Sequence, residues 1–342
     1  MDTSAWRTQV AGRPCPVVGA ALLALMTTRC ECQPDKVHPC LGKVPTRSER
    51  IPADVVKGTP ASDFFRPTLR STEFEAPVPW PGPVNTAGAE DSPFFAPDGS
   101  AFVFFFAPDV RVPAEKQLQD CTAGLWQSRP EGTGWSEPVR LLLNDDVALD
   151  GCPFVQGDTL WFCSARAGNF RGVDAWLATA DDDGWSDWRN AGEQLNQQRQ
   201  IGEWHIGSDG NTMYFGADRS GGQGGLDLYS MPRVGDGWGE PVNLGAVIND
   251  AGDQARPFLA ADGSELWWDS NSAHGGTGPA AWRSKRDANG NWGAAEEIVS
   301  NFAGEPTLDP DGNLYFVHHF MTDPVAGPIQ IVEADIYVAK RK

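Results

Sequence analysis

From about residue 71 onward, short apolar and aromatic runs alternate with turns that are rich in Asp, Gly and Pro. Five aromatic runs each follow an Asp-containing turn: FVFFF at 102–106, LWF at 160–162, MYF at 213–215, LWW at 266–268 and LYF at 314–316. An Asp-Gly pair between two hydrophobic runs is a strong signal for a β-hairpin. The pattern therefore predicts short antiparallel strands joined by tight turns.

Each aromatic run lies within a longer internal repeat. Each repeat begins with an aromatic residue, which is followed by an Asn and then by a short strand. We call the Pro or Trp of this strand, five residues before the turn, the anchor of the repeat. The anchors are Pro93, Pro153, Trp204, Pro257 and Pro306, which are 60, 51, 53 and 49 residues apart. A period near 50 residues with four short strands in each repeat is typical of a propeller blade.

The phase of the repeat predicts how the ring closes. The repeats begin with an outer-strand element near residues 72–79 and end with an inner element of the fifth repeat. The last blade then lacks its outermost strand, which the N-terminal element supplies. We therefore predict an all-β fold, a single five-bladed β-propeller of four-stranded blades over residues 71–342, closed by the N-terminal strand that completes the last blade.

Composition narrows the classes of protein that remain. Of 342 residues, 38 are Gly and 27 are Pro, a density that would interrupt most helices of a long bundle. The formal net charge of −19 disfavours nucleic acid as a partner. Most of the 14 Trp recur at equivalent repeat positions, so we expect them to pack between blades rather than to form a platform for a ligand. We expect a monomer.

The first residues follow a different pattern. Arg7 and Arg13 precede a short apolar run, PVVGAALLALM at 16–26, and this order is typical of a secretory signal. We therefore interpret residues 1–32 as a signal peptide or a lipoprotein signal, and residues 33–70 as a linker that leads to the domain.

Export would place the protein in the periplasm or the outer envelope, or outside the cell if it is secreted. A lipid on Cys30 or Cys32 would be its only membrane attachment, although Arg29 and Glu31 depart from the small residues usual before a lipidated cysteine. The alternative is a buried apolar segment at the N-terminus.

Cys152 and Cys163 flank the turn Gly157-Asp158 and are equally far from it. In a simple antiparallel hairpin they would face each other with Cα atoms about 5 Å apart, within the range of a disulfide. A disulfide and a pair of small buried thiols both remain open. The seven cysteines show no paired CxxC spacing, so we predict no structural metal site.

The third repeat is the most regular. It reads SDGNTMYFGADRSGGQGGLDLYSMPRVGDGWGEPVNLGAVIND from Ser208 to Asp250. With its DG turn, YF strand, Gly-rich loop and W-x-x-P-x-N-L-G segment, it resembles the WD-repeat-like propeller repeats of bacterial envelope proteins, as in TolB and in lipoproteins associated with OmpA-type domains. The resemblance implies a propeller fold, an envelope location and a binding role. It implies no single chemistry, because propellers have many functions.

The residue before each anchor occupies an equivalent place on the innermost strand, which lines the central channel of a propeller. These residues are Ser92, Cys152, Glu203, Arg256 and Glu305. If they face the channel, they form a ring in which Arg256 lies between two carboxylates. The ring is then either held together by these ion pairs alone or binds a polar ligand. His205 is a further candidate for a channel ligand, since it replaces the apolar residue that follows the anchor.

Two functions follow from these features. The first is a non-catalytic binding module of the cell envelope, with a protein, a peptide or a glycan as its partner. The alternative is a carbohydrate-active enzyme, a glycoside hydrolase or lyase, in which Glu203, Glu305 and Asp91 supply an acid, a base and an orienting group. We expect Arg256 to lower the pKa of these carboxyls, which disfavours a general acid. We predict neither a metal nor another cofactor.

Overall fold

The computed structural model describes residues 45–117, 121–144, 147–181, 184–272 and 277–342. The predicted signal, the candidate lipidation sites Cys30 and Cys32, and the first part of the predicted linker lie outside these residues. Within the described part of the chain, no helix has the length and apolar character needed to span a bilayer. The helices are α1 (Arg47–Arg50), α2 (Ala114–Gln117) and the π-helix η1 (Gln194–Arg199).

Antiparallel sheets form most of the regular structure. One sheet has the order β12-β11-β10-β9, with β9 (Leu149–Gln156), β10 (Thr159–Ala165), β11 (Asp174–Asp181) and β12 (Gly184–Asn190). A second contains β13 (Trp204–Ile206), β14 (Thr212–Ala217), β15 (Asp227–Val234), β16 (Gly237–Trp238) and β17 (Val242–Asn243). A third has the order β1-β21-β20-β19-β18, with β1 (Thr68–Leu69), β18 (Gln254–Leu259), β19 (Glu265–Ser270), β20 (Ala280–Lys285) and β21 (Glu296–Ser300).

The remaining large sheet joins the beginning of the chain to its end. Its strands are β22 (Ala303–Leu308), β23 (Leu314–Met321), β24 (Ile331–Ala339), β2 (Val78–Pro79), β3 (Ala89–Phe95), β4 (Phe102–Ala107), β5 (Gly124–Ser128) and β8 (Val139–Arg140). β2 pairs with β24, placing Val78 opposite Val338. β24 and β3 share one parallel pair, Ala334 with Ala89. A separate hairpin consists of β6 (Pro130–Glu131) and β7 (Gly134–Trp135).

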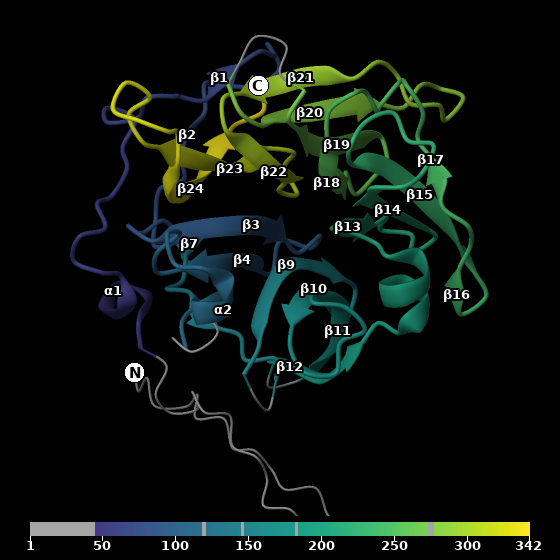
Figure 1. Ribbon diagram of the computed structural model, residues 1–342, viewed down its shortest axis with the longest axis horizontal. Coiled ribbons are helices and arrows are strands. Elements are labelled where there is room, and N and C mark those ends of the chain that lie inside the picture. Colours follow the sequence, from purple (N-terminus) through teal and green to yellow (C-terminus); the bar gives the residue numbers. More distant parts are fainter. Residues whose placement is uncertain (1–44, 118–120, 145–146, 182–183, 273–276) are drawn as a thin grey trace, which may run out of the picture.

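The sheets stand around a common centre, as the view down the shortest axis of the molecule shows (Figure 1). The strands nearest to that centre are β3, β9, β13, β18 and β22. β3 contacts β9 and β22, and β18 contacts β13 and β22. This radial arrangement of antiparallel sheets is β-propeller-like and confirms the predicted all-β class.

The repeated polar residues hold each sheet together. The side chain of Asn249 accepts a hydrogen bond from the backbone N–H of Leu228 and donates one to its carbonyl, at 2.8 and 3.0 Å. Asn85 does the same to Ile336 of β24, at 3.0 and 2.8 Å. Asp227 accepts bonds from the backbone N–H groups of the Gly-rich loop before β15. The Asn and Asp of the repeat are therefore structural residues.

Aromatic side chains fill the space between neighbouring sheets. The rings of Phe95 on β3 and Tyr315 on β23 lie 4.5 Å apart. Trp161 on β10 meets Trp204 on β13 with ring centroids 6.4 Å apart. Both contacts join different repeats, which agrees with the expectation that the aromatic residues pack between blades.

The boundary placed at residue 71 is wrong, because the chain packs on the sheets from residue 45 onward. The guanidinium of Arg47 is buried and forms an ion pair of 3.1 Å with Glu90. Lys57 bonds to Glu333 and Asp335, and β1 adds a strand to β21. The basic residues of this segment therefore neutralise buried carboxylates, which would otherwise be costly to enclose. Their partners lie far away in the sequence, so composition alone suggested a linker.

Candidate functional site

The five ring residues meet at the centre of the molecule, as predicted. Ser92, Cys152, Glu203, Arg256 and Glu305 all line one small central cavity of about 60 Å³. Ser92, Cys152, Arg256 and Glu305 have φ angles of 49°, 49°, 52° and 52°. The strand register shifts at each of these four positions. A bulge with a left-handed residue before the anchor is thus a property of the repeat, and it turns that side chain toward the axis.

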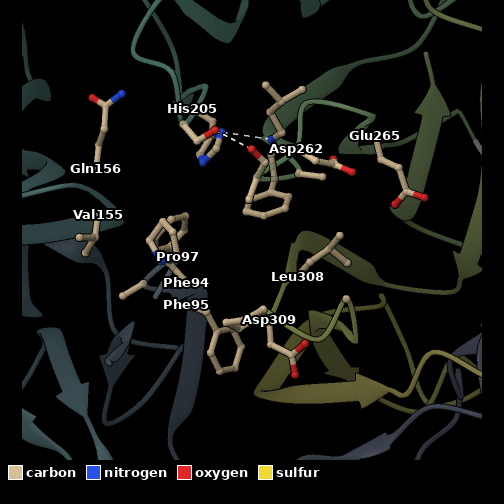
Figure 2. Close-up of a pocket in the computed structure, with 18 of the residues that line it drawn as sticks. Phe94, Phe95, Pro97, Val155, Gln156, His205, Asp262, Glu265, Leu308 and Asp309 are labelled. Carbon is tan, nitrogen blue, oxygen red and sulfur yellow. Dashed lines mark hydrogen bonds between the residues drawn. The ribbon is translucent and has the colours of Figure 1, made fainter. Parts of the chain in front are cut away.

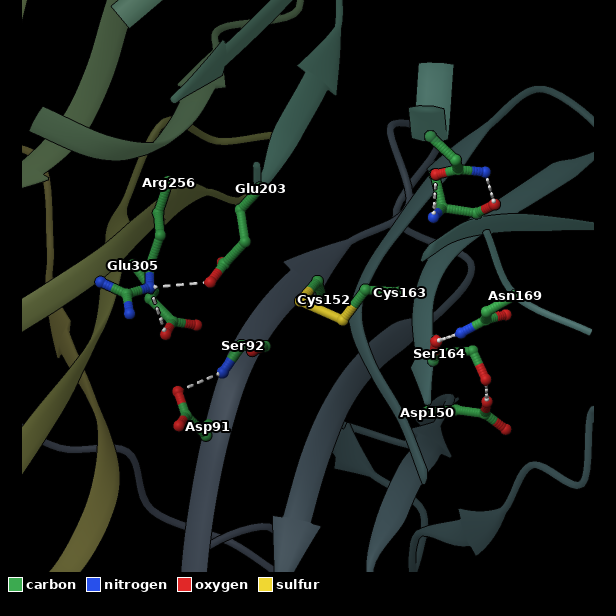
Figure 3. Close-up of a disulfide and its surroundings, with 12 residues drawn as sticks. Asp91, Ser92, Asp150, Cys152, Cys163, Ser164, Asn169, Glu203, Arg256 and Glu305 are labelled. Carbon is green, nitrogen blue, oxygen red and sulfur yellow. Dashed lines mark hydrogen bonds and ion pairs between the residues drawn. A yellow bond between two sulfur atoms is a disulfide. The ribbon is translucent and has the colours of Figure 1, made fainter. Parts of the chain in front are cut away.

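Arg256 is the centre of a cluster of charges (Figure 3). Its Nε lies 3.2 Å from an oxygen of Glu203 and 3.0 Å from an oxygen of Glu305. Both predicted ion pairs are therefore present. Its Nη1 forms a third ion pair of 2.8 Å with Asp269. One guanidinium thus contacts three carboxylates, so the cluster has an excess of negative charge when all are ionised.

Burial dominates the pKa values of this cluster. Burial raises the pKa of Glu305 well above its usual range, and the nearby charge of Asp91 raises it further, against the opposing effect of Arg256. Burial also raises the pKa of Asp269 to about 6. Arg256 lowers the pKa of Glu305, as expected, but burial and the charge of Asp91 outweigh this effect. The net shift is upward, so the neighbouring cation does not exclude Glu305 as a general acid.

A cavity of about 680 Å³ opens on one side of the cluster. Glu203, Arg256 and Asp269 line it together with the indole of Trp204. The side chains of Arg256 and Glu203 are 38% and 35% exposed, so a molecule in the cavity can reach them. Oδ1 of Asp269 is buried and has no hydrogen-bond partner among the described residues. The cavity thus offers the charged groups of Glu203 and Arg256 to a polar molecule.

Asp269 is the site residue that sequence reasoning missed. It lies on β19 opposite Ala255, the neighbour of Arg256. An acidic residue directly after the aromatic run LWW was the available signal, since other repeats have Cys163, Gly216 or Val317 there. Recognising its role required the register between two strands.

Cys152 and Cys163 form a disulfide with Cα atoms 5.4 Å apart. This decides between the two states that the sequence left open. The predicted pairing was slightly wrong, because Cys163 lies opposite Gly151 and Cys152 lies in the bulge. Cys163 and Asp269 hold equivalent places in their sheets, so the disulfide joins the same two positions as the ion pair between Arg256 and Asp269.

Asp91 and Ser92 lie beside the cluster without bonding to Arg256. A carboxylate oxygen of Asp91 accepts a hydrogen bond from the backbone N–H of Ser92 at 2.7 Å. The charge of Asp91 acts on Glu305 and Arg256 through space. The predicted role of Asp91 as a neighbouring orienting charge is compatible with this position.

An aromatic layer separates the cluster from the other end of the axis. It consists of the residues that follow four of the anchors, with neighbouring ring centroids 4.9–6.2 Å apart: Phe94, Phe154, His205 and Phe258. Beyond this layer lies a second cavity of about 450 Å³ (Figure 2). His205 therefore belongs to the aromatic layer and lines both the small central cavity and the second cavity.

Comparisons with known proteins give only distant structural similarities. No protein-family model and no curated protein matches the sequence. A thermostable family-43 glycoside hydrolase aligns with a TM-score of 0.49 and 16% identity over 75% of this chain and 92% of its own. A periplasmic gluconolactonase of Pseudomonas aeruginosa aligns with a TM-score of 0.41 and 14% identity, over 77% and 92%. At these values the similarity assigns no role to any residue of this chain.

Proposed function

We propose that this chain is a carbohydrate-active enzyme, a glycoside hydrolase, and that its substrate binds in the cavity beside Arg256. The proposal rests on one observation. The carboxyls of Glu203 and Glu305 both contact Nε of Arg256, but their surroundings differ. Glu203 is 35% exposed beside the open cavity, whereas Glu305 is 13% exposed and has a raised pKa. A carboxyl with a raised pKa beside a second carboxyl is an arrangement that glycoside hydrolases use.

The distances favour a particular stereochemical course. Because the two oxygens lie 3.2 and 3.0 Å from the same Nε, they are no more than about 6 Å apart. Retaining glycosidases hold their carboxyls about 5–5.5 Å apart, and inverting enzymes hold them farther apart. We therefore assign Glu203 as the nucleophile, which forms a glycosyl ester. Glu305 protonates the leaving oxygen and then takes a proton from the water that cleaves the ester.

The lining of the cavity beside Glu203 suits a sugar, while Glu305 lines the small central cavity next to it. The carboxylate of Glu203 and the guanidinium of Arg256, which are partly exposed, can bond to sugar hydroxyl groups. Trp204 supplies an apolar surface beside them. No metal takes part in this scheme.

A panel of 4-nitrophenyl glycosides, covering pyranosides and furanosides of both anomers, tests the proposal. We expect release of nitrophenol and a loss of about 10²–10⁴-fold in rate for Glu203→Gln and for Glu305→Gln. Glu240→Gln, at a surface position, is the matched control. A 2-fluoro glycoside of the accepted sugar should label Glu203, detected by mass spectrometry. Labelling elsewhere, or full activity in either variant, contradicts the assignment.

The second candidate is a non-catalytic glycan-binding module of the cell envelope. It is favoured by the fact that Arg256 already pairs with Glu203, Glu305 and Asp269 without a substrate. The same variants separate the two functions on a glycan array. Binding that Glu203→Gln abolishes, with no hydrolysis of the bound glycan, would establish the module and reject the enzyme.

We also propose that the ring has five blades and that β2 closes it. Five inner strands, one ring residue from each repeat, and the pairing of β2 with β24 support this architecture. Deleting residues 1–80 should prevent folding, whereas deleting residues 1–44 should leave the midpoint of thermal unfolding within a few degrees of its original value. Equal stability of the two deletions would contradict closure by β2.

Export to the envelope remains part of the proposal, together with the envelope-type repeat family that the third repeat resembles. The disulfide between Cys152 and Cys163 supports it, because such bonds persist in oxidising compartments. Cell fractionation of the full chain tests export, and metabolic lipid labelling of Cys30→Ser and Cys32→Ser variants tests anchoring. Recovery of the uncleaved chain from the cytosol would reject both.

A further inference from the structure

We propose that the 450 Å³ cavity, on the far side of the aromatic layer from Arg256, binds a planar, uncharged heteroaromatic molecule. In this site His205 donates a hydrogen bond to an acceptor atom at the edge of the ligand. Figure 2 shows the cavity with His205 at its edge, opposite Leu308 and the aromatic side chains of β3. The proposal is independent of the hydrolase function, because a different cavity and different residues carry it.

The dimensions and the lining of the cavity indicate the class of ligand. Its volume lies within the range of about 300–1,000 Å³ that is usual for small-molecule sites. Phe94, Phe258, Val155, Leu259 and Leu308 contribute to its wall. Flat apolar molecules fit such a wall, because ring edges and faces pack well against aromatic side chains.

His205 provides directional recognition within this apolar wall. The residue is 7% exposed, and its Nδ1 accepts a hydrogen bond of 3.1 Å from the backbone N–H of Leu259. Nδ1 therefore carries no proton, and the neutral ring holds its proton on Nε2. Burial lowers the pKa of His205 to about 3, so the ring stays neutral near pH 7. Among the described residues, none accepts a hydrogen bond from Nε2.

Packing alone does not explain the imidazole. The equivalent residues of the first, second and fourth repeats are Phe94, Phe154 and Phe258, which form the same layer without any polar atom. A histidine gives up apolar area and adds two polar nitrogens that need partners. The backbone satisfies one of them, and the other is left for a ligand in the cavity.

The charges at the rim select against anions. The carboxylates of Asp262 and Asp309 line the cavity, and each accepts backbone hydrogen bonds within its own turn. Bonds from Ser264 lower the pKa of Asp262 and keep it ionised. The cation at the rim, Arg341, is already paired with Glu265 at 2.9 Å. An anionic ligand would therefore be repelled, whereas an uncharged one would not.

Three small probes of similar shape test the proposal at pH 7.5 by ligand-observed NMR. Isoquinoline has a ring nitrogen that accepts a hydrogen bond, naphthalene lacks it, and isoquinoline-3-carboxylate adds a negative charge. We expect isoquinoline to bind about fivefold more tightly than naphthalene, as one hydrogen bond provides. The carboxylate should bind most weakly. Equal binding of isoquinoline and naphthalene to the wild-type chain would overturn the proposal.

Variants assign the effect to His205. His205→Phe should remove the preference for isoquinoline over naphthalene, while His205→Gln, which places a donor near the position of Nε2, should keep part of it. Leu308→Trp should fill the cavity and abolish binding of all three probes. If His205→Phe does not fold, the Nε2 resonance of the wild-type His205 decides. A shift on titration with isoquinoline supports the proposal, and an unchanged resonance at saturation refutes it.

Discussion

The two ends of the central axis come from the same strands and have opposite chemistry. The residues before the anchors include Arg256 and Glu305, and those after the anchors include Phe258 and Phe94. Both sets line the small central cavity, because the bulge before each of these anchors turns the preceding side chain toward the axis. Along β18, a step of two residues from Arg256 to Phe258 thus changes the axis from charged to aromatic. The backbone of the repeat determines where side chains meet, whereas the type of side chain at each position can differ.

The two ends are also stabilised in different ways. The charged end depends on mutual compensation, because Arg256 and three carboxylates are each costly to bury alone. The aromatic end depends on close packing, and its stability should respond to volume and not to pH. Four changes, in order of decreasing expected effect, test this difference.

Arg256→Met should have the largest effect. It leaves Glu203, Glu305 and Asp269 without their shared cation, at a cost of about 4 kcal/mol in the free energy of unfolding at pH 7.5. The loss should shrink at pH 5, because the raised pKa values of Asp269 and Glu305 let these two groups take up protons there. Urea denaturation at both pH values measures it. Arg233→Met, at an exposed arginine stacked on Trp238, is the control and should cost less than about 1 kcal/mol. Similar losses in both variants would show that Arg256 does not offset the cost of burying the three carboxylates.

Phe258→Ala should have the next largest effect, about 3 kcal/mol, because it leaves a void in the aromatic layer. The same denaturation series should give the same loss at pH 5 and pH 7.5. Phe170→Ala, at an exposed position, should change little. A loss that varies with pH would mean that the aromatic layer and the charged cluster are energetically coupled, contrary to the contrast drawn above.

Replacing both Cys152 and Cys163 with Ser should lower the free energy of unfolding by about 2 kcal/mol. The disulfide is the covalent equivalent of the ion pair between Arg256 and Asp269, but its effect should be nearly independent of pH and salt. Thermal unfolding in low and high salt measures both properties. A double variant as stable as the parent would show that the bulge at Cys152 is held by the repeat alone.

Glu305→Gln should have the smallest effect on stability and the clearest pH dependence. Since the folded pKa of Glu305 lies above its unfolded value, its contribution to stability is present below about pH 4.5 and is lost as the pH rises through the folded pKa. The variant should therefore match the parent in stability at pH 4 and be more stable than the parent at pH 8. Glu75→Gln, on the surface, should show no such divergence. A variant less stable than the parent at pH 8 would contradict a raised pKa.

The repeat explains which features the sequence could predict. Anchors at a period near 50 residues located the inner strands. The position before each anchor then predicted the ring from Ser92 to Glu305 and the pairing of Arg256 with two carboxylates. Asp269 did not follow, because it reaches Arg256 from a second strand across a bulge. The raised pKa of Glu305 depends on burial and on Asp91, which spacing does not reveal.

Features outside the repeat were hidden for a related reason. Arg47 and Lys57 have no periodic partners, and their contacts with Glu90, Glu333 and Asp335 join distant parts of the chain. Without a period there is no register from which to infer a pair. The packed segment from residue 45 to 70 was therefore predicted as a linker.

The strands β1 and β2 have a consequence for the order of events in folding. Residues 68–69 and 78–79 leave the ribosome early, yet their partners are β21 and β24 near the end of the chain. During synthesis these early strands remain without their partners until more than 200 later residues have left the ribosome. Contacts of such long range slow folding. We expect the last kinetic phase of refolding to be the docking of residues 45–79, after the other sheets have formed.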